Sequence, residues 1–173
     1  MIRFVFWIPV LFVVYTYLLY PVIILVAGRL KKRRPVHHDG DGTLPSVTMI
    51  IIAHNEERII RDKLENCGKL DYPPGLFSVC IVSDGSTDGT AGILEEYGDI
   101  LFIRDDVNRG KPHQINVAVK QCTSDLIVFS DARQIYEPDA LRKLARNFAD
   151  PGIGAVSGEL TFVSPTEDRK SVV

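Results

Sequence analysis

The hydrophobic pattern divides the chain into one long uncharged stretch and a second region of short apolar runs separated by mixed segments. Residues 4–27, FVFWIPVLFVVYTYLLYPVIILVA, contain no charged side chain. As a helix at about 1.5 Å per residue this stretch reaches roughly 36 Å, which exceeds the roughly 30 Å hydrocarbon core of a bilayer. The pattern predicts a transmembrane helix over residues 4–27, in which Pro9 and Pro21 cause bends rather than breaks.

Basic residues flank this stretch unequally. Five lie between positions 29 and 34, whereas only Arg3 and the amino terminus precede it. The positive-inside bias therefore predicts a single-pass protein of the cell inner (plasma) membrane whose soluble part is cytoplasmic. The alternative, a cleaved signal peptide, would have an apolar region of about 7–15 residues. Residues 28–45 mix charge, Gly and Pro without periodicity, which indicates a basic juxtamembrane linker.

Beyond residue 45, β-branched apolar runs alternate with helix-like stretches. Near-continuous apolar strands separated by crossover helices indicate a parallel sheet with both faces covered. The predicted fold class is therefore α/β, with a doubly wound, mostly parallel, Rossmann-like sheet. The predicted strands are 47–53, 77–83, 100–103, 126–130 and 154–158, and the predicted helices are 56–67, 87–97, 111–121 and 138–148.

The distribution of charge limits the classes of partner. The 173 residues are 46% hydrophobic and carry a net charge of -2, which indicates one folded domain rather than a disordered chain. Residues 37–173 hold fourteen Lys and Arg against twenty-two Asp and Glu. This acidic balance disfavours nucleic acid as a partner. The three cysteines are too few for a disulfide framework.

Polar residues follow the predicted strands, where ligands bind in a doubly wound sheet. Asp84 ends a buried strand and needs a partner, for which a base or ribose edge is one candidate. Asp131 offers a carboxylate of the kind that holds Mg²⁺ or Mn²⁺ bridging a diphosphate. Lys111 could neutralise a phosphate.

Each candidate also has a structural explanation. Glu56 and Lys111 are ordinary residues for the start of a helix, and Asp131 is an ordinary turn or N-cap residue. Capping by Ser86 or Thr87 explains the turn after the second strand but not Asp84. The chain contains no Gly-x-Gly-x-x-Gly after the first strand, no P-loop and no Gly-x-Ser-x-Gly elbow. Dinucleotide oxidoreductases, P-loop NTPases and α/β-hydrolases are therefore disfavoured.

Four segments occur in order: TMIIIAHNEE, VCIVSDGSTDGT, NRGKPHQIN and IVFSDARQIYEPDAL. Together they resemble the nucleotide-sugar-binding half of a family 2 glycosyltransferase with the GT-A fold, over residues 46–160. The apolar helix resembles the amino-terminal anchor of bacterial membrane-bound members. The resemblance implies inverting transfer of a sugar from a nucleotide-diphosphate donor to an acceptor hydroxyl, assisted by Mg²⁺ or Mn²⁺. It places Ala53 and Glu56 at the nucleoside pocket, Asp84 on the base, Lys111 near the donor, and Asp131 at the metal as first acid of the DXD motif.

Two features depart from the family's pattern. Arg133 stands where the motif commonly has a second acid, so either metal affinity is weaker or Arg133 itself offsets diphosphate charge. Residues 161–173 resemble a polar tail or a truncated start of the acceptor half, so the general base is expected beyond Val173 or on a complementing chain. We expect a UDP-sugar donor and a lipid or polysaccharide acceptor at the cytoplasmic membrane face. Two alternatives stay open: a catalytically incompetent, membrane-tethered nucleotide-sugar-binding module, and a nonfunctional remnant.

Overall fold

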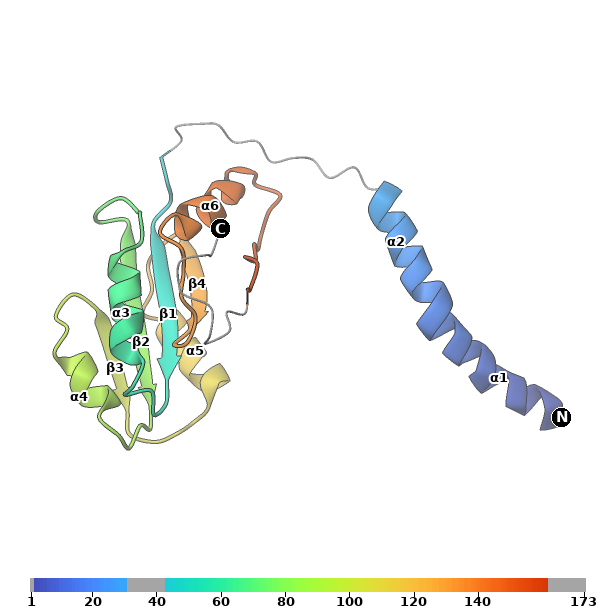
Figure 1. Ribbon diagram of the computed structural model, residues 1–173, viewed down its shortest axis with the longest axis horizontal. Coiled ribbons are helices and arrows are strands. Elements are labelled where there is room, and N and C mark those ends of the chain that lie inside the picture. The colour runs from blue at the N-terminus through green and yellow to red at the C-terminus, as the bar shows by residue number, and fades with distance from the viewer. Residues whose placement is uncertain (1, 31–42, 162–173) are drawn as a thin grey trace. The chain divides into compact units, whose positions relative to one another are not determined.

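The computed structural model describes residues 2–30 and 43–161 (Figure 1). The chain divides into two compact units, Met1–His37 and His38–Val173. Most of the predicted linker 28–45, and all but the first residue of the predicted tail 161–173, lie outside the described residues.

The described part of the first unit, residues 2–30, is a continuous helix. It comprises α1 (Ile2–Val14), the π-helical turn η1 (Tyr15–Leu19) and α2 (Tyr20–Leu30). In the π turn the Tyr20 N–H bonds to the carbonyl of Tyr15, five residues earlier. This wider turn directly precedes Pro21, whose ring would otherwise crowd the preceding turn. By length and composition Val5–Leu30 is long and apolar enough to cross a membrane, although a signal sequence satisfies the same criteria.

The second unit contains a four-stranded parallel sheet. Its strands are β1 (Val47–Ala53), β2 (Phe77–Asp84), β3 (Leu101–Asp105) and β4 (Leu126–Asp131), in the order β3-β2-β1-β4. In the register, Ala53 lies beside Ser83, and Ile52 lies beside Asp131. The carboxyl ends of β1, β2 and β4 are therefore level.

Helices cover both faces of the sheet, as the doubly wound prediction requires. Alternate residues of β1 point to opposite faces, so Met49 and Ile51 belong to one core cluster and Ile50 to the other. The first cluster includes residues of α3 (Ile60–Gly68), α4 (Thr90–Glu95) and α6 (Ala140–Arg146), and α3 lies in front of the sheet in Figure 1. The second includes Ala118 of α5 (Lys111–Val119). A 3₁₀ turn, η2 (Asn147–Ala149), follows α6.

The fifth strand predicted at residues 154–158 is not formed: the structure describes these residues as irregular and mostly exposed. Gly154 and Gly158 lack side chains and lose the most conformational freedom on ordering. The burial of Ala155 and Val156 would offset little of that entropy cost. The apolar pattern alone was therefore too weak to specify a strand.

Candidate functional site

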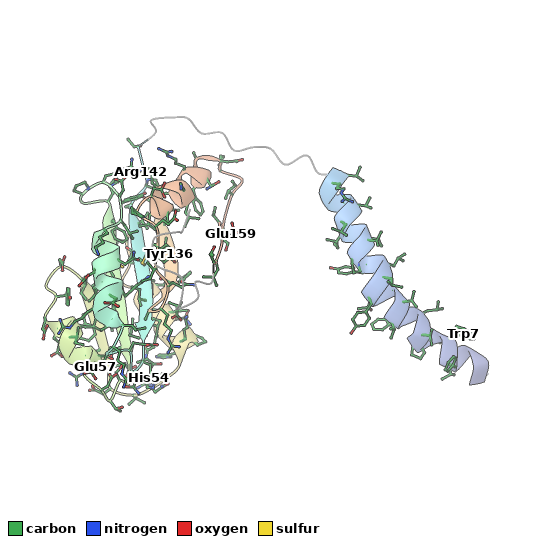
Figure 2. All side chains as sticks on the ribbon, in the orientation of Figure 1. Trp7, His54, Glu57, Tyr136, Arg142 and Glu159 are labelled. Carbon is green, nitrogen blue, oxygen red and sulfur yellow. The ribbon has the colours of Figure 1, made fainter. Side chains whose placement is uncertain are left out.

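The strand order creates a switch point between β1 and β4. The chain adds β2 and β3 on one side of β1 and then returns to place β4 on the other side. In open α/β sheets ligands bind outside the carboxyl ends of the strands at this position. His54 and Glu57 lie at this end of the sheet (Figure 2). Residues 54–57 and 131–134 therefore flank the candidate site.

Two ion pairs connect the segments around the switch point. Lys111 Nζ lies 3.4 Å from Asp131 Oδ2, and the Arg133 guanidinium lies 3.2 Å from Glu56 Oε1. The Lys111 and Arg133 side chains are 54% and 75% exposed, so the pairs contribute little to stability. The structure thus brings together Glu56, Lys111 and Asp131, and adds Arg133 to them.

Asp131 is held in a tight turn. Its Oδ1 accepts a hydrogen bond from the Arg133 N–H at 3.1 Å, and its own N–H donates to Gln134 Oε1 at 3.0 Å. These bonds confirm the turn interpretation of Asp131. Partial burial raises the pKa of Asp131, but the Arg133 N–H and the nearby Lys111 charge lower it more, so the net pKa is below its usual range. The carboxylate is therefore ionised at neutral pH.

Asp84 is buried, with 3% of its surface exposed. Its Oδ1 accepts hydrogen bonds from the Arg109 N–H at 2.8 Å and Gln114 Nε2 at 2.7 Å, and its Oδ2 accepts one from the Gly110 N–H at 3.0 Å. Burial raises the pKa of Asp84, but these three hydrogen bonds together lower it by a larger amount. The pKa of Asp84 is therefore below its usual range. Asp84 therefore fixes the backbone directly before Lys111, and its contact with a base stays a prediction.

Asn55 joins the loops that follow β1 and β2. It has a positive φ of 54°, a conformation that asparagine tolerates better than most residues. Its N–H donates to Ser86 Oγ at 3.2 Å, and its Oδ1 accepts from the Thr87 N–H at 2.8 Å. His54 contributes a hydrogen bond between its Nδ1 and the carbonyl of Asp84 at 2.6 Å. His54 thus bonds the loop after β1 to the end of β2.

Asp88 accepts the hydrogen bond at the start of α4 that was expected to go to Ser86 or Thr87, and a second one from the turn before α3. Its Oδ1 accepts from the Thr90 N–H at 3.0 Å, and its Oδ2 accepts from the Glu57 N–H at 3.2 Å. The expected cap is wrong because Ser86 and Thr87 bond to the loop after β1 instead. Helix α4 consequently starts at Thr90 rather than at residue 87.

Ala53 and Glu56 differ in accessibility. Ala53 is completely buried and packs in the core. The Glu56 N–H is fixed by Thr90 Oγ1 at 2.9 Å, and its side chain is 17% exposed. Ala53 therefore lies in the core at the end of β1, whereas the partly exposed Glu56 carboxylate pairs with Arg133.

The donor set for a metal ion is limited. Among residues 2–30 and 43–161 no group of three or more His, Cys, Asp or Glu residues could hold one. Asp131 supplies a carboxylate oxygen 3.4 Å from Lys111 Nζ. Mg²⁺ is commonly held by one or two carboxylates together with substrate phosphates. The residues therefore fit a divalent cation only if a diphosphate provides most of the other ligands.

Lys63 was missed at the sequence level. It is completely buried on α3, where burial lowers its pKa and the nearby Cys67 and Asp131 partly oppose this effect. The available signal was its place on the apolar stripe of Ile60, Leu64 and Cys67. A lysine on such a stripe requires polar partners inside the protein.

The sequence of the second unit matches a known family. Residues 48–172 match the family described as "Glycosyl transferase family 2". The chain belongs to this family. Poly-beta-1,6-N-acetyl-D-glucosamine synthase of Staphylococcus aureus (strain COL) is 34% identical over 133 residues, which are 75% of this chain and 31% of that protein. The Staphylococcus epidermidis synthase is 30% identical, with 76% and 31% covered. The chain spans about a third of the length of these relatives.

Solved structures share the fold. The mannosyltransferase PcManGT from Pyrobaculum calidifontis, in complex with GDP-Man and Mn²⁺, is similar with a TM-score of 0.69 and 31% identity, over 77% of this chain and 41% of that one. Staphylococcus aureus TarS 1-349 in complex with UDP-GlcNAc is similar with a TM-score of 0.52 and 30% identity, over 61% and 31%. These similarities confirm the GT-A fold and the predicted family membership.

Proposed function

We propose that the second unit is the donor-binding part of an inverting glycosyltransferase that transfers a sugar from a nucleotide-diphosphate donor. The observation that carries this proposal is the meeting of Lys111, Arg133, Asp131 and Glu56 at the switch point between β1 and β4. The side chains of Lys111 and Arg133 remain more than half exposed and can approach an incoming diphosphate. The family assignment supports the same chemistry.

The donor is, in this proposal, a UDP-sugar. TarS has been solved with UDP-GlcNAc, and the Staphylococcus relatives are named as N-acetylglucosamine polymer synthases. PcManGT has been solved with GDP-Man, so GDP is the competing nucleotide. We assign Ala53, Glu56 and Asp84 to the nucleoside end of the site, and Lys111 and Asp131 to the diphosphate end.

The proposed chemistry depends on charge at the leaving group. Negative charge grows on the nucleoside diphosphate as the sugar departs, and fixed cations stabilise that charge. Lys111 acts there as a point charge, whereas the planar guanidinium of Arg133 matches two phosphate oxygens. Mg²⁺ or Mn²⁺, held by Asp131 and the diphosphate, would supply Lewis-acid stabilisation when bound.

The membrane segment gives the proposed reaction its location. We propose that residues 4–27 anchor the protein in the inner membrane, with the second unit in the cytoplasm. The acceptor is then a lipid or growing polysaccharide at the cytoplasmic face. The apolar helix Val5–Leu30 and the basic residues after it support this location.

The test is calorimetric titration of the full chain in detergent with UDP and GDP, each with Mn²⁺. We expect Lys111→Met to weaken binding of the preferred nucleotide about 10–100-fold, the equivalent of about 1.5–3 kcal/mol for a charged hydrogen bond. Lys143→Met is the matched control, because Lys143 of α6 forms a similar exposed ion pair with Asp139, the residue before the helix. Absence of binding to both nucleotides, or equal effects of the two variants, would refute the proposal.

A further inference from the structure

The Lys63 side chain is among the largest that are fully buried in the described part of the chain. Its Nζ donates hydrogen bonds to Ser130 Oγ at 2.8 Å and to the Gln134 carbonyl at 2.7 Å. It also lies 4.6 Å from the centre of the Tyr136 ring. Among the ion pairs of the described residues none includes Lys63. Burying an ammonium without a contacting carboxylate is costly, so these contacts need an explanation beyond packing.

All three contacts fall on one segment, residues 130–136. Ser130 and Gln134 bracket the turn that carries Asp131 and Arg133. Within that turn the Gln134 N–H donates to the Asp131 carbonyl at 3.2 Å, and Ser130 Oγ donates to the same carbonyl at 3.1 Å. Lys63 therefore holds both ends of the turn from below through one nitrogen atom.

Asn66, one helical turn further along α3, holds the same segment at its far end. Its Nδ2 donates to the Tyr136 carbonyl at 2.8 Å, and its Oδ1 accepts from the Tyr136 N–H at 2.9 Å. Tyr136 is labelled in Figure 2. Because residues three apart share a face of a helix, Lys63 and Asn66 act together as a tether between α3 and the turn.

We propose that Lys63 is a positioning residue for the donor site. It fixes the turn 131–134 so that the Asp131 carboxylate faces Lys111 and a bound diphosphate. This inference rests on the proposed function, because the turn matters to catalysis only if a donor binds beside Asp131. Groups that orient a metal-binding residue typically change metal affinity 10–100-fold when they are removed.

The test uses Lys63→Met in the full chain, since methionine keeps much of the apolar stem and removes the donor nitrogen. Leu64→Ala is the matched control, because Leu64 is the next residue of α3 and packs in the core. The first readout is hydrogen–deuterium exchange of the peptide covering residues 130–136. The second is the ratio of the nucleotide dissociation constants measured without and with Mn²⁺. A loss of global stability alone would not change this ratio in a folded protein.

We expect Lys63→Met to speed exchange in residues 130–136 and to reduce the Mn²⁺-dependent gain in affinity at least about tenfold. Leu64→Ala should lower stability and leave both readouts near wild type. Unchanged exchange in Lys63→Met overturns the tether. Faster exchange together with an unchanged ratio of the nucleotide dissociation constants without and with Mn²⁺ overturns the link to the donor site. Failure of the wild-type chain to bind UDP or GDP refutes the proposed function instead, and also removes the link to a donor.

Discussion

Gly85 occupies a position where any side chain would collide with the backbone of a neighbouring loop. It has a φ of 61°, and its N–H donates to the Asp105 carbonyl at 2.8 Å. A Cβ atom placed there would overlap the backbone nitrogen of Asn108 and lie 2.9 Å from the carbonyl carbon of Val107. Because backbone cannot swing aside as a flexible side chain can, Gly85→Ala must displace the segment around Asn108.

The expected cost combines two effects. A left-handed conformation costs a non-glycine residue about 1–2 kcal/mol, and forcing an extra carbon into a packed site costs about 1–3 kcal/mol more. Gly85→Ala should therefore lower the free energy of unfolding by about 2–5 kcal/mol. This is a large part of the roughly 5–15 kcal/mol that stabilises a typical domain. Gly92→Ala is the matched control: it lies in α4 with nothing within 4 Å of a new Cβ, so a gain of about 0.5–1 kcal/mol is expected.

Urea denaturation of the full chain in detergent, followed by circular dichroism, measures both variants. The midpoint should fall for Gly85→Ala and rise slightly for Gly92→Ala. A Gly85→Ala protein within about 0.5 kcal/mol of wild type would refute the reasoning, because the close approach of Gly85 to Asn108 could then not be rigid. Nucleotide affinity should fall as well, since the displaced segment includes the Arg109 and Gly110 N–H groups that bind Asp84.

Two further predictions concern charged residues of the site. Asp84→Asn leaves at least one buried N–H group without an acceptor and should cost about 1–3 kcal/mol at pH 7 by urea denaturation. Since the folded-state pKa of Asp84 is lowered, its contribution is present above the unfolded pKa of about 3.9 and is lost as pH falls through the folded value. The difference between Asp84→Asn and wild type should thus narrow below about pH 4, and a constant difference would contradict this explanation. Arg133→Met should change stability by less than about 1 kcal/mol, because Arg133 is 75% exposed, but should weaken calorimetric nucleotide binding about tenfold; unchanged affinity would remove Arg133 from the diphosphate end.

The four strands could be predicted because each contains a short apolar run between polar segments. Residues 47–53 were predicted with the observed bounds of β1. The starts of helices were harder to predict. Helix α3 begins at Ile60 rather than at residue 56, after a turn in which the Glu56 N–H donates to Thr90 Oγ1. That contact joins residues 34 apart, and local patterns carry no information about it.

The candidate site was predictable only in part. The rule that ligands bind beyond strand ends placed Glu56, Asp131 and Lys111 at one edge, and the ion pairs confirm that Lys111 and Asp131 meet. The partners of Asp84 could not be predicted, because two of the three are main-chain N–H groups, and which carboxylate they reach does not depend on the side chains of that loop. The sequence does show Lys63 as a charged residue on the apolar face of a helix. The turn that it contacts, between Ser130 and Gln134, can be identified only from the three-dimensional structure.

The way in which Asp84 is bound also determines how freely the loop before α5 can vary. Because the donors at positions 109 and 110 are peptide N–H groups, any residue except proline can supply the bond at position 109. Gly110, with a φ of 85°, is restricted by its own backbone conformation. A saturation library across residues 106–110 should therefore tolerate most replacements at 106 and 109, reject proline at 109, and retain glycine at 110. The chain path of this loop is constrained more tightly than its side-chain chemistry.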